Sequence, residues 1–291
     1  MIGEIFGLMA ALSWAVGSIF DRIGLRRIPP LLANTMRSIP SAIFTFILMV
    51  VFEGPESFIS VPVLDLLFIV SGTTLALVIG DYLFLYSLRR LGVSKTMPIV
   101  SIYPVFALSG AFFLLAENIT IFIIIGTLLV ICGIYLLSRS RNNKKDEAAS
   151  RKYILMIPIM AALMWGLSQV FFTLALINVP PFTMTTIRLF YFSSLLTGIN
   201  LVSGERRFYK NYSSYWGKMS TIGGFFSLAI GGLFLMLGLS YVGVAKTSPL
   251  TSITPLFSTI LAVFLLKEKV DHNIALGTVL IVIGVIIITV L

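Results

Sequence analysis

The sequence predicts an all-α membrane protein with ten transmembrane helices, arranged as two inverted-topology five-helix repeats. Two observations carry this prediction. First, 58% of the 291 residues are hydrophobic and only 11% are charged, which the surface of a water-soluble protein of this size could not accommodate. Second, the two halves of the chain match without a gap at an offset of 151 residues, and a repeat of this kind reveals the architecture.

The repeat is clearest where KTMPIVSIYP at residues 95–104 returns as KTSPLTSITP at residues 246–255. Many residues elsewhere follow the same offset. It superposes Trp14 on Trp165, Pro29 and Pro30 on Pro180 and Pro181, Arg37 on Arg188, Gly92 on Gly243, and Glu117 on Glu268.

Apolar runs of about 20 residues, the length that crosses the hydrocarbon core as a helix, follow one another along the whole chain. They do not alternate as barrel strands would, and irregular backbone cannot face lipid. We therefore expect a first repeat over residues 1–138, a charged linker over 139–152 and a second repeat over 153–291. The predicted spans are 3–25, 31–52, 63–88, 94–115, 119–138, 153–176, 181–202, 218–242, 246–266 and 272–291.

The odd number of spans in each half predicts that the second half enters the membrane from the opposite side, which is typical of transporters. Most of the 21 lysines and arginines fall in the loops after the odd-numbered spans, whereas the opposite loops hold only Lys246. By the positive-inside rule, these basic loops are cytoplasmic and both termini lie outside. The basic pI therefore reports membrane orientation, and a nucleic-acid partner is not expected.

These motifs resemble a known family. The Ala-Leu-x-Trp pattern around Trp14 and Trp165, the Pro-Pro pairs followed by an arginine, the proline-containing fourth and ninth spans and the Leu-x-Glu that closes them are similar to the EamA-type ten-helix branch of the drug/metabolite transporter superfamily. The resemblance covers the whole chain in register. It implies transport of a small metabolite, often an amino acid or a nucleotide-linked compound. Members of this branch usually keep both termini in the cytoplasm, whereas the loop charges here favour the reverse.

Three charged residues lie well inside predicted spans, where an unpaired ion costs several kcal/mol: Arg37, Asp81 and Arg188. Arg37 and Asp81 are expected at a similar depth, roughly 9–10 Å inside the same face at 1.5 Å per residue, and are predicted to pair. Arg188 has no acidic counterpart in the repeat, so its guanidinium is free to bind a carboxylate or phosphate. The alternative is that it caps carbonyl groups of a neighbouring helix. Asp21 and Glu117, near span ends, are explained by contact with the interface.

Prolines are expected to unwind the fourth and ninth spans and to free carbonyls that must line water, protein or ligand. Polar side chains beside them are candidate substrate ligands, although helix–helix hydrogen bonding is the simpler explanation for some. Trp14 and Trp165 are interpreted as walls of a central cavity, with plain packing as the alternative. The prolines are Pro98, Pro104, Pro249 and Pro255, and the polar candidates are Tyr103, Thr251 and Thr254.

An enzyme is not expected, because the sequence offers no nucleophile and base set. Cys132 in an apolar run and His272 in a loop suggest neither a metal site nor a cofactor. We predict a monomeric secondary transporter of the cell membrane that carries an amino acid or a related anionic or zwitterionic solute, with a proton or counter-substrate as coupling partner. Alternating access is expected to come from the two five-helix repeats rocking about a cavity between them. The alternative is a proton-coupled exporter of lipophilic cations, in which Asp81 is the only carboxylate available for coupling.

Overall fold

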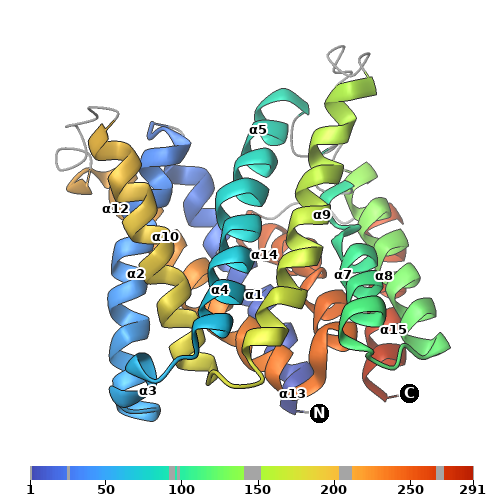
Figure 1. Cartoon of the computed structure of the whole chain (residues 1–291). Coiled ribbons are helices and arrows are strands. Elements are labelled where there is room, and N and C mark those ends of the chain that lie inside the picture. The colour runs from blue at the N-terminus through green and yellow to red at the C-terminus, as the bar shows by residue number, and fades with distance from the viewer. Residues whose placement is uncertain are drawn as a thin grey trace.

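The computed structural model of the chain describes residues 2–24, 27–91, 96, 99–140, 152–202, 212–266 and 272–290. These residues form helices joined by turns and short loops (Figure 1). The first half contains α1 (Ile2–Gly24), α2 (Pro30–Phe52), the short α3 (Glu56–Ile59), α4 (Val63–Thr73), the π-helix η1 (Thr74–Gly80), α5 (Asp81–Leu91), α7 (Tyr103–Leu115) and α8 (Ile121–Ser140). The second half contains α9 (Lys152–Ala175), α10 (Pro181–Val202), α12 (Tyr215–Gly224), the π-helix η3 (Phe225–Gly231), α13 (Gly232–Thr251), α14 (Thr254–Leu266) and α15 (His272–Val290).

The helices are those of a membrane protein. Among the described residues, six are long and apolar enough to cross a bilayer, and two shorter apolar helices accompany them. Large apolar side chains such as Phe113, Leu128 and Val51 are exposed at the surface, as expected where the surrounding solvent is lipid. The six long spans are Ile2–Asp21, Leu31–Phe52, Val63–Phe84, Leu155–Ala175, Tyr215–Thr251 and His272–Val290, and the shorter helices are Tyr103–Leu115 and Ile121–Leu137.

The predicted helix boundaries agree with these elements to within a few residues, but several spans are interrupted. The fourth span turns at residues 101–102 before α7, and the ninth turns at residues 252–253 before α14. Pro104 and Pro255 are each the second residue of the helix that follows, where a missing N–H is tolerated. Pro249 lies within α13. Pro98 lies outside the described residues.

Two further features mark the helices, and the first of them was not predicted. Residues 74–80 and 225–231 are π-helical, and a π-helical stretch rotates every later side chain relative to the α-helical period. α13 also contains a sharp kink at Gly243, which has φ 71°. Glycine adopts this left-handed conformation at no steric cost, so the predicted break at Gly243 is present as a kink.

Both chain termini lie at one end of the molecule (Figure 1), which we call the terminus end. The same end holds α3, the α7–α8 connection, the α9–α10 connection and the kink of α13. The other end, which we call the far end, holds the connection between α1 and α2, the end of α5 and the beginning of α12. The exposed basic residues Arg27, Arg90 and Lys218 belong to far-end segments.

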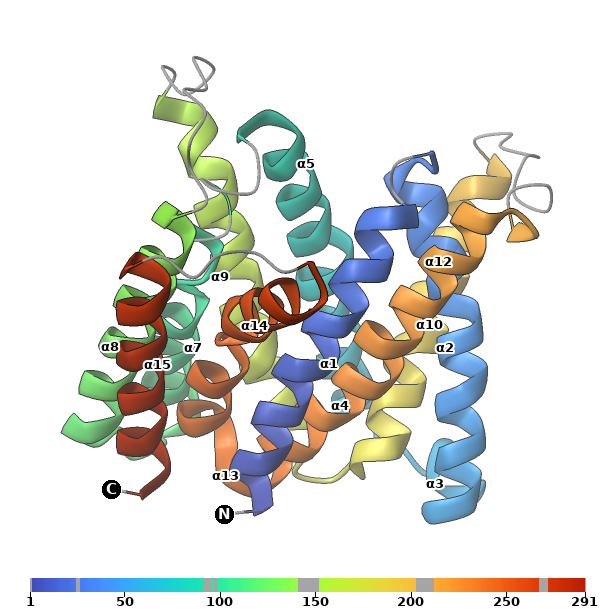
Figure 2. The same ribbon diagram turned by 180° about the vertical axis from the view of Figure 1, so that it is seen from behind.

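The first helix of each half packs against the other half. α1 lies along α12, η3, α13 and α14, as Figure 2 shows, whereas α9 lies along α4, η1, α5 and α7. α2 packs on α12, η3 and α10, and α10 packs on α2, α13 and α4. We therefore distinguish a first packing group, made of α1, α2, α12, η3, α13 and α14, from a second packing group, made of α4, η1, α5, α7, α9 and α10.

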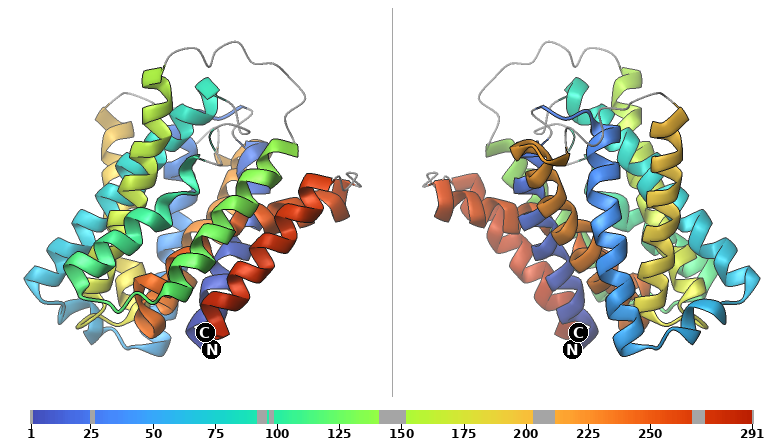
Figure 3. Two further views of the ribbon diagram at one scale, coloured as in Figure 1. Left: turned by 90° about the vertical axis from the view of Figure 1, so that its right-hand side faces the viewer. Right: turned by 90° about the vertical axis from the view of Figure 1, so that its left-hand side faces the viewer.

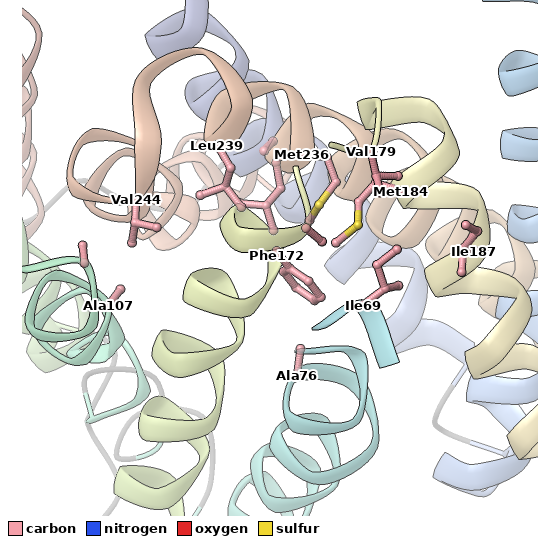
Figure 4. Close-up of a cluster of buried hydrophobic side chains, with 14 residues drawn as sticks. Ile69, Ala76, Ala107, Phe172, Val179, Met184, Ile187, Met236, Leu239 and Val244 are labelled. Atoms are coloured by element: carbon pink, nitrogen blue, oxygen red, sulfur yellow. The ribbon is translucent and has the colours of Figure 1, made fainter. Parts of the chain in front are cut away.

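The two packing groups meet along α2 and α10, and where α13 contacts α7, α9 and α10. A dry cluster fills this contact toward the terminus end (Figure 4). Phe172, Val179 and Met184 of the second group, or of its α9–α10 connection, pack there with Met236 and Leu239 of α13. The terminus end of the contact is thus closed by apolar side chains.

α8 and α15 form a separate antiparallel pair at one side of the molecule (Figure 3). Their glycines allow the backbones to touch: a Cβ at Gly126 would lie 2.8 Å from the carbonyl oxygen of Gly284, and one at Gly133 would lie 2.6 Å from that of Gly277. Close approach through small residues is the usual basis of helix association in lipid.

Candidate functional site

Arg37 of α2 is held by an ion pair and a hydrogen bond. Its Nη1 lies 3.2 Å from Oδ2 of Asp21 on α1, and both side chains are nearly buried. Its Nη2 donates to the hydroxyl of Ser227 in η3 at 2.8 Å. All three residues belong to the first packing group, so these contacts stabilise that group internally.

The predicted pair of Arg37 with Asp81 is therefore wrong. Asp81 begins α5 directly after η1, and Trp165 Nε1 of α9 donates to its Oδ1 at 3.2 Å. Arg37 and Arg188 act on Asp81 electrostatically, but neither forms an ion pair with it among the described residues. The prediction failed because a similar depth in the membrane does not establish that two side chains face each other.

Asp21 was also misjudged as a residue explained by the interface. Its carboxylate is the partner of the buried Arg37. A buried ion of either sign needs such a partner, because losing one member of the pair typically costs about 3–5 kcal/mol.

Arg188 of α10 is 3% exposed and forms no ion pair with the described residues. Its guanidinium carbon lies 5.3 Å from the ring centre of Phe172, a cation–π contact, and its Nη2 lies against the backbone of Gly232. Its Nε has no hydrogen-bond partner. This buried cation thus retains donors for an anion.

The two tryptophans donate to π-helical carbonyls across the molecule. Trp14 Nε1 donates to the carbonyl of Ser227 at 3.0 Å, and Trp165 Nε1 donates to the carbonyl of Ala76 at 3.2 Å. Carbonyls in π-helices have irregular partners, and the indole N–H groups satisfy these two. Trp165 also contacts Tyr103, with ring centres 6.3 Å apart.

Tyr103, at the start of α7, connects the broken fourth and ninth spans. Its hydroxyl lies 2.7 Å from Oγ1 of Thr251 and 3.1 Å from the carbonyl of Ser248. Thr254 instead donates to the carbonyl of Thr251 at 2.9 Å, within the turn before α14. Tyr103 and Thr251 therefore join Trp165 and Asp81 in one region, whereas Thr254 has a local structural contact.

Sequence reasoning missed two polar residues on α9. Gln169 is buried beside the Tyr103 hydroxyl, and its Oε1 has no hydrogen-bond partner. Thr173 lies one turn further along α9, and its hydroxyl is also buried without a partner. Their helical spacing from Trp165 was a signal available in the sequence, but uncharged polar residues in a span are most often explained by helix packing.

We name Asp81, Tyr103, Trp165, Gln169, Arg188 and Thr251 the central polar cluster. It contains one partly buried acid, one buried cation and uncharged hydrogen-bonding groups. Unpaired polar atoms at such depth are costly, and two atoms of this cluster, Arg188 Nε and Gln169 Oε1, have no hydrogen-bond partner. Within the described residues, no three His, Cys, Asp or Glu side chains are grouped to hold a metal.

The apolar exterior, the long spans and the buried polar interior define a multi-pass integral membrane protein of the cell membrane. The model of the EamA-like transporter family matches residues 1–139 and, a second time, residues 151–290. The chain therefore belongs to the EamA-like transporter family, and the expected membership of the drug/metabolite transporter superfamily is confirmed.

Known proteins of similar sequence are also transporters. An uncharacterised transporter of Archaeoglobus fulgidus is 23% identical over 98% of this chain and 97% of its own length. The uncharacterised transporter YoaV of Bacillus subtilis is 29% identical over 47% of this chain and 46% of its own length. A solved crystal structure covers 99% of this chain with a TM-score of 0.81 at 16% identity, with 96% of its own chain covered, which establishes the likeness of the fold.

Proposed function

We propose that this membrane transporter carries a small anionic or zwitterionic metabolite, with an amino acid as the leading class. The observation that supports this most directly is Arg188, a buried guanidinium that has no acidic partner among the described residues. A carboxylate or phosphate would supply the missing charge and accept parallel N–H bonds. Asp81 is the acid of the central polar cluster, and it suits the ammonium group of a zwitterion.

We further propose that the two halves are inverted repeats of five helices each, making ten spans in all. Equivalent features recur at the offset of 151 residues: both π-helices, both turns at 101–102 and 252–253, and both tryptophan-to-carbonyl hydrogen bonds. α1 begins at the terminus end and α9 begins at the far end (Figure 1). This opposite direction supports inversion.

The repeat supports a mechanism of alternating access. The packing suggests that the moving bodies are the two packing groups rather than the halves of the sequence, because α1 and α9 are exchanged between halves. Pro104 and Pro255, next to the turns in the fourth and ninth spans, are the expected bending points. Coupling to a proton or counter-substrate belongs where the repeats differ, as at Asp81 and its counterpart Gly232, or Tyr103 and its counterpart Thr254.

The experiment that tests this function is a ligand screen on the purified monomer in detergent. Amino acids, dicarboxylates, phosphorylated solutes and quaternary ammonium compounds are compared by thermal shift, and each hit is followed by flux into proteoliposomes. We expect a rise in melting temperature and saturable flux for a solute with an acid group. A response to lipophilic cations alone would instead favour the multidrug exporter.

We propose that the far end is cytoplasmic and both termini are outside, because exposed Arg27, Arg90 and Lys218 belong to the far end. Single cysteines replacing Glu56 and Lys218, in a Cys132→Ser background, test this in intact cells. An impermeant maleimide should label position 56 and spare position 218. Labelling of position 218 alone would reverse the orientation.

A further inference from the structure

Two carboxylates cross between the packing groups at the terminus end. Glu53 follows α2 of the first packing group and binds the beginning of α10 in the second. Glu117 follows α7 of the second packing group and binds α13 of the first. Each packing group thus contributes one carboxylate that binds the other group.

Glu53 binds two backbone amides and one hydroxyl. Its Oε1 accepts from the Phe182 amide at 3.0 Å, and its Oε2 accepts from the Thr183 amide at 2.6 Å and the Thr183 hydroxyl at 2.8 Å. α10 begins at Pro181, so these amides are among those that have no partner within the helix. A carboxylate at this position also interacts favourably with the helix dipole.

Glu117 binds α13 in the same way. Its two oxygens accept from the amides of Val244 at 2.9 Å and Ala245 at 2.8 Å. These amides are free because Gly243, with φ 71°, breaks the helix immediately before them. A Cβ at Gly243 would lie 2.8 Å from Glu117 Oε1, so the kink and the carboxylate fit each other. This contact also corrects the expectation that Glu117 is explained by the membrane interface.

The dry cluster of Val179, Met184, Met236 and Leu239 reinforces these contacts at the terminus end. The residue 151 positions after Glu53 is Gly204, and Glu205 follows it. The counterpart of Glu117 is Glu268. All three lie outside the described residues.

We propose that Glu53 and Glu117 form a latch that holds the terminus end closed in the substrate-free protein. Release of both carboxylates from the helix termini is then required before this end opens. This inference rests on the proposed alternating access, because it states which end of the transporter is closed in the resting state.

The test measures distances between pairs of spin labels attached to introduced cysteines, in a Cys132→Ser background and without any substrate. One pair replaces Val51 of α2, in the first packing group, and Ile177 of the α9–α10 connection, in the second; these residues are 69% and 72% exposed. The second pair replaces Phe113 and Tyr241, which are 79% and 62% exposed and lie near the Glu117 contact. Each pair is measured in the parent protein, in Glu53→Gln and in the control Glu56→Gln, which alters an exposed glutamate of α3.

Glu53→Gln replaces a charged acceptor with a weaker neutral one, and we expect about a tenfold rise in the ratio of the longer-distance to the shorter-distance population. The rise should occur at both pairs, including the remote pair at Phe113 and Tyr241, because rigid packing groups open together. Glu56→Gln should match the parent. An unchanged distribution at the remote pair would overturn the latch and reduce Glu53 to a local helix cap.

If Glu53→Gln aggregates, the reciprocal variant Glu117→Gln is measured at the Val51 and Ile177 pair: a rise in the longer-distance population supports the latch, and an unchanged distribution overturns it. Neither measurement requires a transported solute. A failed ligand screen therefore leaves the latch measurable, and an unchanged distance distribution leaves the proposed substrate class to be judged by the screen.

Discussion

Arg37 and Arg188 occupy equivalent positions in the two halves, yet their surroundings differ. Arg37 is bound by Asp21 and Ser227, whereas the residues related to these two by the repeat are Phe172 of the second half and Ala76 of the first. Arg188 contacts the Phe172 ring instead of a carboxylate. The Nε atoms of both arginines lack a partner, but Arg37 alone has its charge neutralised by direct contact. The difference is therefore an ion pair at one arginine and none, within the described residues, at the other.

The largest expected effect is on stability at the Arg37 site. Arg37→Gln leaves Asp21 buried without its cation, so we expect a loss of about 3–5 kcal/mol in the free energy of unfolding. Thermal unfolding in detergent measures it. The double variant Asp21→Asn, Arg37→Gln should recover part of the loss, whereas Arg37→Gln with Asp81→Asn should not. Recovery with Asp81→Asn instead would show that Arg37 depends on Asp81.

The comparison can be sharpened by rebuilding the ion pair of Arg37 around Arg188. Phe172→Asp places a carboxylate at the position equivalent to Asp21, and the matched control Phe172→Asn has nearly the same size without the charge. Because an internal anion competes with the ligand for Arg188, affinity for the transported solute should be roughly 10- to 100-fold weaker in the aspartate variant than in the asparagine variant, from the strength of charged hydrogen bonds. Equal affinities would indicate that Arg188 does not bind the solute.

The tryptophans provide a third comparison with a smaller effect. Trp14→Phe removes one hydrogen bond to the Ser227 carbonyl, which should cost about 0.5–1.5 kcal/mol of stability beyond the change in packing. Trp165→Phe removes its bond to Ala76 and also the bond to Asp81. We therefore expect Trp165→Phe to alter solute affinity as well as stability, and Trp14→Phe to alter stability alone. Binding and melting curves of the two variants separate these outcomes.

Much of the fold could be predicted from the sequence, because hydrophobic runs, Gly243 and the prolines determine where helices form and where they are interrupted. The exchange of α1 and α9 could not be predicted, since an apolar face does not specify which helix covers it. The choice of Asp81 over Asp21 as the partner of Arg37 failed for a related reason. The prediction compared only how deep the two residues lie in the membrane and did not consider which way each side chain points around its helix. The π-helix η1 rotates Asp81 away from its α-helical position.

At the site, the absence of an acid at Gly232, the counterpart of Asp81, led to the prediction that Arg188 has no acidic partner in the repeat, and Arg188 forms no ion pair with the described residues. Its place in the substrate site stays a prediction. Gln169 was missed because an amide in a span carries no charge to single it out. Glu53 was missed because acidic residues in loops usually face water, and its role depends on the start of α10 lying beside it.

The central claim is that Arg188 binds the acid group of the solute, and the most direct measurement compares two ligands on two variants. The solute found in the screen and its carboxamide analogue are titrated against the parent, Arg188→Gln and Arg37→Gln. The account predicts that the parent and Arg37→Gln prefer the acid by at least about tenfold, the scale of a charge-assisted hydrogen bond, and that Arg188→Gln binds the two ligands equally. Retention of the preference in folded Arg188→Gln would contradict the account.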